Sequence, residues 1–131
     1  MSEGFGSAWV ALSVALAIHV TDEALTDFLS VYNPAVRAIR ARFPFLPLPT
    51  FTFRVWLTGL VLAVLVLASL TPFAFRGEGW MQPLAYAFGF VMAGNGLLHL
   101  AASVYMRKAM PGVYSAPLIL GAALYLLACV P

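Results

Sequence analysis

Charged residues are scarce in this chain of 131 residues: Lys and Arg number 7, Asp and Glu number 5, and together they make up 9%. Ordinary soluble domains carry about 25% charged residues. Because 63% of the residues are hydrophobic and the mean hydropathy is +0.94, a soluble fold of this length would leave much apolar surface in water. The scarcity of charge therefore predicts a membrane protein, and a net charge of +2 gives no support for nucleic-acid binding.

Cysteine is also nearly absent. The one cysteine, Cys129, permits neither an internal disulfide nor a metal site built from several cysteines. The first apolar stretch has no basic segment before it, since only Glu3 is charged there, and no small-residue cleavage site follows it. We therefore expect this stretch to be a retained helix rather than a signal peptide.

Long apolar runs, by contrast, are plentiful. A helix needs about 20 apolar residues to cross the hydrocarbon core of a bilayer. Four segments are predicted to do so, at residues 5–29, 53–73, 81–106 and 114–130. The expected fold is all-α: a polytopic membrane protein forming a single domain over residues 1–131, with four transmembrane helices in one bundle.

The first connection and the third span carry further patterns. Val36, Ile39 and Phe43 recur at helical spacing among arginines, which predicts a short helix lying in the membrane interface and ended by the prolines from Pro44 onward. In the third span, small residues recur every fourth position and predict close packing of another helix; they are Ala85, Gly89 and Ala93. Aromatic residues near the span ends are expected to be interfacial anchors; they are Trp9, Trp56, Trp80 and Tyr114.

Basic residues are distributed unevenly over the expected loops. Six of them belong to the first and third connections or flank them: Arg37, Arg40, Arg42, Arg54, Arg107 and Lys108. The other side has only Arg76, with Glu78 and Glu3 nearby. The positive-inside rule then predicts that both termini lie outside and both basic connections lie in the cytoplasm.

Polar residues interrupt the first and third spans at helical spacing. His19, Asp22 and Glu23 stand at positions i, i+3 and i+4, and Asn95 and His99 stand at i and i+4, so each set shares one face of its helix. The two spans run in the same direction in the expected topology, which puts both histidines in the same half of the bilayer. Because an acid near the centre of a membrane helix costs roughly 2.5–3.5 kcal/mol, we expect the two sets to converge inside the bundle.

Two simpler interpretations stand beside this one. Asp22, Glu23 and Asp27 would be an ordinary polar helix end if the first helix finished near Val20. The polar pair of the third span would be interhelical hydrogen-bonding residues without a chemical role. The sequence does not assign Asp27 or Ser103 to the site.

Three short motifs resemble those of a known family. "HVTDE", "NGLLH" and "PGVYS" occur in the order seen in the HxxEE family of small bacterial membrane proteins, whose function is unassigned. Asp22 stands where the family has Glu, and Ser115 stands where Thr is expected; both keep the functional group. The resemblance implies a membrane-embedded site in a bacterial plasma membrane, formed by His19, Asp22, Glu23, Asn95, His99 and Ser115.

The first functional hypothesis is a metal-dependent enzyme, a hydrolase or an oxidoreductase, acting on a lipid-like or isoprenoid substrate. His19, His99 and Glu23 supply two nitrogens and one oxygen, a donor set suited to a divalent ion such as zinc, iron or manganese. Asp22 would be the general base, and Asn95 would orient His99 or the substrate.

Two other hypotheses use the same residues. A metal-free site without a cofactor could isomerise or cyclise an apolar substrate by acid–base chemistry, because a dry environment favours a neutral carboxylic acid. A transporter or binding module for a proton or metal ion is the third, and four spans would then require a homo-oligomer. The expected partners are membrane lipids and an apolar small molecule, with no nucleic acid.

Overall fold

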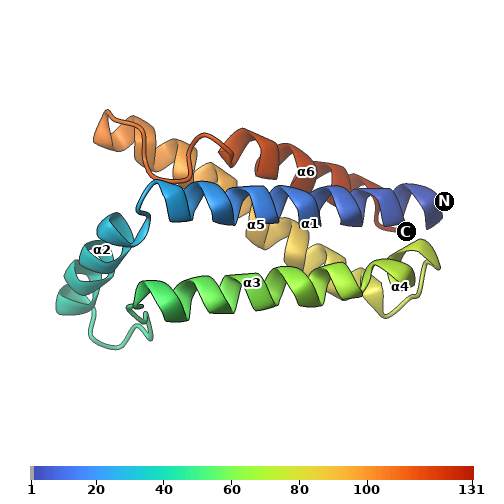
Figure 1. Ribbon diagram of the computed structural model, residues 1–131, viewed down its shortest axis with the longest axis horizontal. Coiled ribbons are helices and arrows are strands. Elements are labelled where there is room, and N and C mark those ends of the chain that lie inside the picture. Colours follow the sequence, from blue (N-terminus) through green and yellow to red (C-terminus); the bar gives the residue numbers. More distant parts are fainter. Residues whose placement is uncertain (1) are drawn as a thin grey trace.

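The computed structural model describes residues 2–131, and these form helices without any strand (Figure 1). Three apolar segments are long enough to cross a membrane, Glu3–Leu25, Phe53–Phe75 and Met81–Met106, whereas Ala116–Cys129 is a shorter apolar helix. The all-α class is confirmed, and helix length alone supports three of the four predicted spans. The helices in chain order are α1 Ser2–Leu25, α2 Leu29–Arg42, α3 Phe53–Ser69, α4 Thr71–Phe75, α5 Met81–Met106 and α6 Ala116–Cys129.

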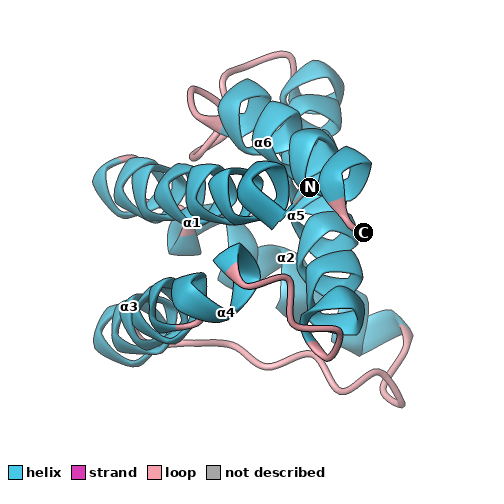
Figure 2. Cartoon of the chain, turned by 90° about the vertical axis from the view of Figure 1, so that its right-hand side faces the viewer, coloured by secondary structure: helices cyan, strands magenta, loops and turns pink. Residues whose placement is uncertain are grey.

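Helix α1 lies at the centre of the packing. It contacts α6, α3 and α4, while α5 packs along α6. The view along the helices in Figure 2 shows α1 between α6 and α3. Both termini lie at one end of the molecule, and α2 and the connection from α5 to α6 lie at the other (Figure 1). The core contains several fully buried side chains: Phe5, Trp9, Leu12, Met81, Ile119 and Leu126.

Small residues allow α5 and α6 to approach closely. Ala85, Gly89 and Ala93 are buried on α5, as the sequence predicted. A Cβ atom on Gly89 would lie 2.6 Å from Leu127 Cδ2, and one on Gly96 would lie 3.0 Å from the carbonyl oxygen of Ala116. Larger side chains at these positions would therefore force the two helices apart.

The first helix is shorter than predicted. It ends at Leu25 rather than at residue 29, because Asp27 adopts a left-handed conformation with φ 57° that a helix cannot contain. A second helix, α2, starts at Leu29, so the expected short helix of the first connection is present but begins earlier. It ends at Arg42, just before Pro44, where the sequence predicted its end.

The other boundaries differ by a few residues. The predicted second span, 53–73, is divided into α3 and the short α4, which has Pro72 in its first turn. The predicted third span, 81–106, matches α5, and the fourth, 114–130, is trimmed to α6. Proline has no backbone N–H to continue the hydrogen-bond ladder, which accounts for the break between α3 and α4.

Trp9 is not an interfacial anchor. Its side chain is fully buried, and its indole Nε1–H donates to the carbonyl oxygen of Leu67 at 2.8 Å. Leu67 lies in the last turn of α3, and its carbonyl oxygen also accepts from the backbone N–H of Leu70 at 3.2 Å. Trp56 is also buried, with 8% of its surface exposed, whereas Trp80 is 48% exposed as expected for an anchor.

Candidate metal centre

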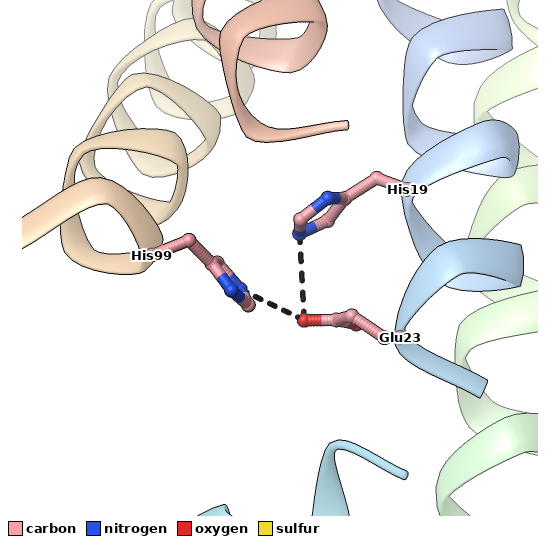
Figure 3. A group of neighbouring side chains, drawn as sticks. All are labelled: His19, Glu23 and His99. Atoms are coloured by element: carbon pink, nitrogen blue, oxygen red, sulfur yellow. Dashed lines mark ion pairs between the residues drawn. The ribbon is translucent and has the colours of Figure 1, made fainter. Parts of the chain in front are cut away.

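A buried carboxylate lies between two histidine rings. Glu23 Oε1 is 3.4 Å from His19 Nε2 one turn earlier on α1, and 3.0 Å from His99 Nε2 on α5. Figure 3 shows the Glu23 side chain extending from α1 toward both rings. The three residues are 1%, 5% and 3% exposed for His19, Glu23 and His99. The two polar faces predicted from helical spacing therefore do meet in the interior.

The geometry of these three residues fits a metal ion. One ligand atom from each of the three lies within 4.8 Å of the other two. A tetrahedral ion with bonds of about 2.1 Å requires its ligand atoms to lie about 3.4 Å apart. The two measured separations, 3.0 and 3.4 Å, are close to that value. Two imidazoles and one carboxylate also form a donor set typical of catalytic zinc or non-haem iron.

Glu23 has no Arg or Lys partner among the described residues, and its charged-group contacts are the two histidines alone. A buried carboxylate is stable only if a proton or a cation neutralises it and hydrogen bonds satisfy its oxygens. Neutral imidazoles donate hydrogen bonds but supply no positive charge. The environment of Glu23 therefore requires a proton, on Glu23 itself or on a histidine, or a bound cation.

A chain of hydrogen bonds fixes the ring of His19. His19 Nδ1 lies 2.7 Å from Ser115 Oγ, and the Ser115 hydroxyl donates to Asp22 Oδ2 at 2.7 Å. Since the single hydroxyl proton goes to the carboxylate, the oxygen of Ser115 accepts the proton of Nδ1. With the proton on Nδ1, His19 Nε2, which faces Glu23 Oε1 and Asn95 Oδ1, is the ring nitrogen that could bind a metal.

Asp22 and Asn95 both lie beside the centre, in contact with His19 or with its partner Ser115. Asp22, expected to be a general base, accepts both the hydroxyl and the backbone N–H of Ser115, the latter at 2.8 Å. Asn95, expected to orient His99 or a substrate, instead places Oδ1 3.1 Å from His19 Nε2. Both residues therefore contact or support His19. Asp22 is also half-buried at the edge of a groove of about 530 Å³ that α1 presents with Val14 and Ile18.

Gly112 brings the turn before α6 against the site. Its φ is +87°, a conformation that side chains rarely adopt. A Cβ atom there would lie 2.6 Å from His99 Cε1 and 2.8 Å from Glu23 Cγ. Its backbone N–H donates to Thr26 Oγ1 at 3.1 Å, which ties the turn to the end of α1. Reasoning from the sequence missed Gly112 and Thr26, although the Pro-Gly pair is a turn signal that could have identified the glycine.

His99 is held by packing rather than by a second hydrogen bond. Its ring lies edge-on to His19 with 4.7 Å between centroids and packs on Phe28 at 5.6 Å. His99 Nδ1 is buried and has no hydrogen-bond partner among the described residues. Of the two unassigned residues, Asp27 is exposed in the turn after α1, and Ser103 bonds the carbonyl of His99 and the N–H of Met110. Neither contributes a side chain to the centre.

Comparison with known proteins identifies a family for this chain but no function. No curated protein and no solved structure matches the chain. A family model described as a protein of unknown function with HXXEE motif matches residues 9–126, which include all three motifs and every residue of the centre. The chain therefore belongs to the HXXEE family.

Proposed function

We propose that this protein is a membrane-embedded, metal-dependent enzyme acting on a lipid-like substrate. The observation that carries the proposal is the buried group of His19, Glu23 and His99, whose ligand atoms lie within 4.8 Å of one another. A structural hydrogen-bond network would not need a carboxylate surrounded only by histidines. A divalent zinc, iron or manganese ion would supply the missing positive charge.

We place the chain in a bacterial plasma membrane as four spans with both termini outside and α2 in the cytoplasmic interface. Supporting this, the termini lie at one end of the molecule and both basic connections lie at the other (Figure 1). Helix α6, with 14 residues, is about 21 Å long. The turn before α6 then lies at membrane depth, where irregular backbone is tolerated because protein surrounds it.

In this proposal three residues bind the ion, and three others position His19. His19 Nε2, His99 Nε2 and a Glu23 oxygen bind the ion, which when bound supplies a Lewis acid or an activated water. Ser115 and Asp22 keep the proton of His19 on Nδ1, and Asn95 limits rotation of its ring. The apolar groove of α1 beside Asp22 is the place where a lipid-like substrate would lie next to the residues that support His19. Either hydrolysis or oxidation is compatible with these residues.

Metal analysis of purified variants tests the proposal. The parent protein should carry about one transition-metal ion per chain, and His99→Ala and His19→Ala should carry none, because two donors bind far more weakly than three. Ser13→Ala is the matched control. Ser13 is buried on α1, the helix of His19, but bonds only the carbonyl of Trp9. Loss of metal from the control, or its retention in both histidine variants, would refute the proposal.

Metal-free acid–base chemistry is a second candidate, supported by a different observation. Within residues 2–131, His99 Nδ1 has no hydrogen-bond partner, and the 3.0 Å between Glu23 Oε1 and His99 Nε2 is also the length of a hydrogen bond. In that case Glu23 and the histidines exchange a proton with an apolar substrate such as an isoprenoid. A parent protein that is active without metal and unaffected by chelators would favour this candidate.

A further inference from the structure

An aromatic hollow adjoins the candidate centre on the side of α2 and α3. It has a volume of about 290 Å³, and its walls include Phe28, Tyr32, Phe51, Trp56 and Gly59. The rings form a continuous stack: Phe28 lies 5.5 Å from Tyr32 and 5.9 Å from Trp56, and Tyr32 lies 6.0 Å from Phe51. Phe28 also packs on His99, so one ring belongs both to this hollow and to the surroundings of the centre.

A basic hollow lies along the same hairpin. It has a volume of about 430 Å³ and is lined by Arg37 and Arg40 of α2 and by Pro44 and Thr50 of the segment that returns to α3. The ion pairs found among residues 2–131 involve neither arginine. Two guanidinium groups without acidic partners are suited to bind a phosphate or carboxylate group.

The two hollows are lined by adjacent residues of the returning segment. Thr50 lines the basic hollow and Phe51 lines the aromatic one, and neighbouring Cα atoms are about 3.8 Å apart. Asn33 fixes this segment to α2, since its side-chain amide donates to the carbonyl of Phe51 at 2.8 Å and accepts from the N–H of Phe51 at 3.0 Å. Both walls are therefore held in place by the fold.

We propose that this hairpin, together with the start of α3, binds an anionic amphiphile, with its phosphate-like headgroup on Arg37 and Arg40 and its apolar tail in the aromatic hollow. Charge complementarity selects the headgroup, and the aromatic lining selects an apolar tail. The positive-inside rule alone would explain the arginines but not the adjoining aromatic hollow. The inference that this ligand is the substrate rests on the proposed function, whereas the binding of the ligand to the hairpin does not.

Binding of farnesyl phosphate to the full-length protein in uncharged phosphatidylcholine nanodiscs tests the proposal. Gly59→Leu should fill the tail site without disturbing the fold, because a Cβ atom there meets nothing within 4 Å. Its matched control is Gly94→Leu on α5, where a Cβ atom also meets nothing. Arg37→Gln/Arg40→Gln removes the headgroup contacts, and Arg107→Gln/Lys108→Gln removes two charges from the same end of the molecule as its control.

The proposal predicts a distinct pattern over three probes. Gly59→Leu should weaken binding of both farnesyl phosphate and farnesol by at least about tenfold, whereas the arginine pair should weaken only farnesyl phosphate, by a similar factor. Both control variants should match the parent protein. Inorganic phosphate should compete far less well than farnesyl phosphate, because it lacks the tail.

Three results would overturn the proposal: test variants that bind like their controls, farnesol that binds the parent as tightly as farnesyl phosphate, or inorganic phosphate that competes equally well. The last result would identify an anion site with no adjoining site for the apolar tail. Because His19 is a proposed metal ligand that lines neither hollow, His19→Ala should keep the affinity for farnesyl phosphate. Failure of the proposed metal-dependent function and failure of this binding proposal are therefore distinguishable.

Discussion

At the scale of single residues, His19 is the most completely held side chain of the centre. One ring nitrogen faces Glu23 and Asn95, and the other bonds Ser115, which in turn bonds Asp22. A histidine that binds a metal commonly donates its second N–H to an acceptor of this kind, which fixes the ring and raises its basicity. Asp22 and Ser115 are therefore best understood as residues that position His19.

Ser115 provides the first residue-scale prediction. Ser115→Ala removes the acceptor of His19 Nδ1 and a donor to Asp22, so metal affinity should fall by roughly 10–100-fold. Ser115→Thr keeps the hydroxyl and should retain most of the affinity. Competition with a metal chelator measures both, and ¹⁵N chemical shifts of His19 should show its proton on Nδ1 in the parent and the threonine variant. Equal affinities in the alanine and threonine variants would show that the hydroxyl has no part in metal binding.

Gly112 provides the second residue-scale prediction. Gly112→Ala combines a φ of +87° with a Cβ atom that would lie 2.6 Å from His99 Cε1, so we expect a loss of roughly 1–3 kcal/mol of stability and displacement of His99. Thermal unfolding in detergent and metal content measure the two effects. Gly79→Ala is the control, because its Cβ meets nothing within 4 Å. An alanine variant as stable as this control, with full metal content, would contradict the close packing described for the turn.

At the scale of elements, apolar length and polar spacing predicted much of the structure, and backbone conformation accounts for the errors. Helix α5 matched its predicted bounds, and the spacing of His19 with Glu23 predicted their shared face. The end of α1 was missed because the left-handed conformation of Asp27 leaves no signal in hydropathy. Trp9 was misassigned because its partner, the carbonyl of Leu67, is distant in sequence. The contact of Asn95 with His19 depends in the same way on how two helices are rotated.

The contact between α5 and α6 gives an element-scale prediction. Gly96→Leu would push against the backbone of Ala116, which follows Ser115 directly, so it should destabilise the protein by about 1–3 kcal/mol and weaken metal binding. Gly94→Leu, two residues earlier on the same helix, meets open space and should do neither. Thermal unfolding and metal analysis of the two variants provide the comparison. If both leucine variants unfold at the same temperature, α6 is not positioned by this contact.

At the scale of the whole molecule, the two ends differ in charge. Six basic residues lie in α2, at the start of α3 and in the connection from α5 to α6, and both termini lie at the opposite end (Figure 1). The centre is nearer the basic end, because His19 and Glu23 occupy the last two turns of α1. In the proposed orientation, a substrate with its headgroup at the cytoplasmic surface would bring the upper part of its tail to the depth of the candidate centre.

Cysteine labelling tests this orientation. In a Cys129→Ser background, which removes the one native cysteine, Arg40→Cys should react with a membrane-impermeant maleimide only after the cells are opened. Glu78→Cys, in the turn between α4 and α5, should react in intact cells. Labelling of the Arg40 position in intact cells would reverse the assigned topology while leaving the fold unchanged.

The most direct test of the central claim is X-ray absorption at the metal edge of the purified parent protein. The account predicts one transition-metal ion per chain, with two imidazole nitrogens and at least one carboxylate oxygen at about 2.0–2.2 Å. Glu23→Gln preparations that still retain some ion should keep the imidazole signal, because both histidines remain. A parent protein that carries no stoichiometric metal and takes up none from added zinc, iron or manganese would contradict the claim, as would a bound ion with no histidine in its coordination shell.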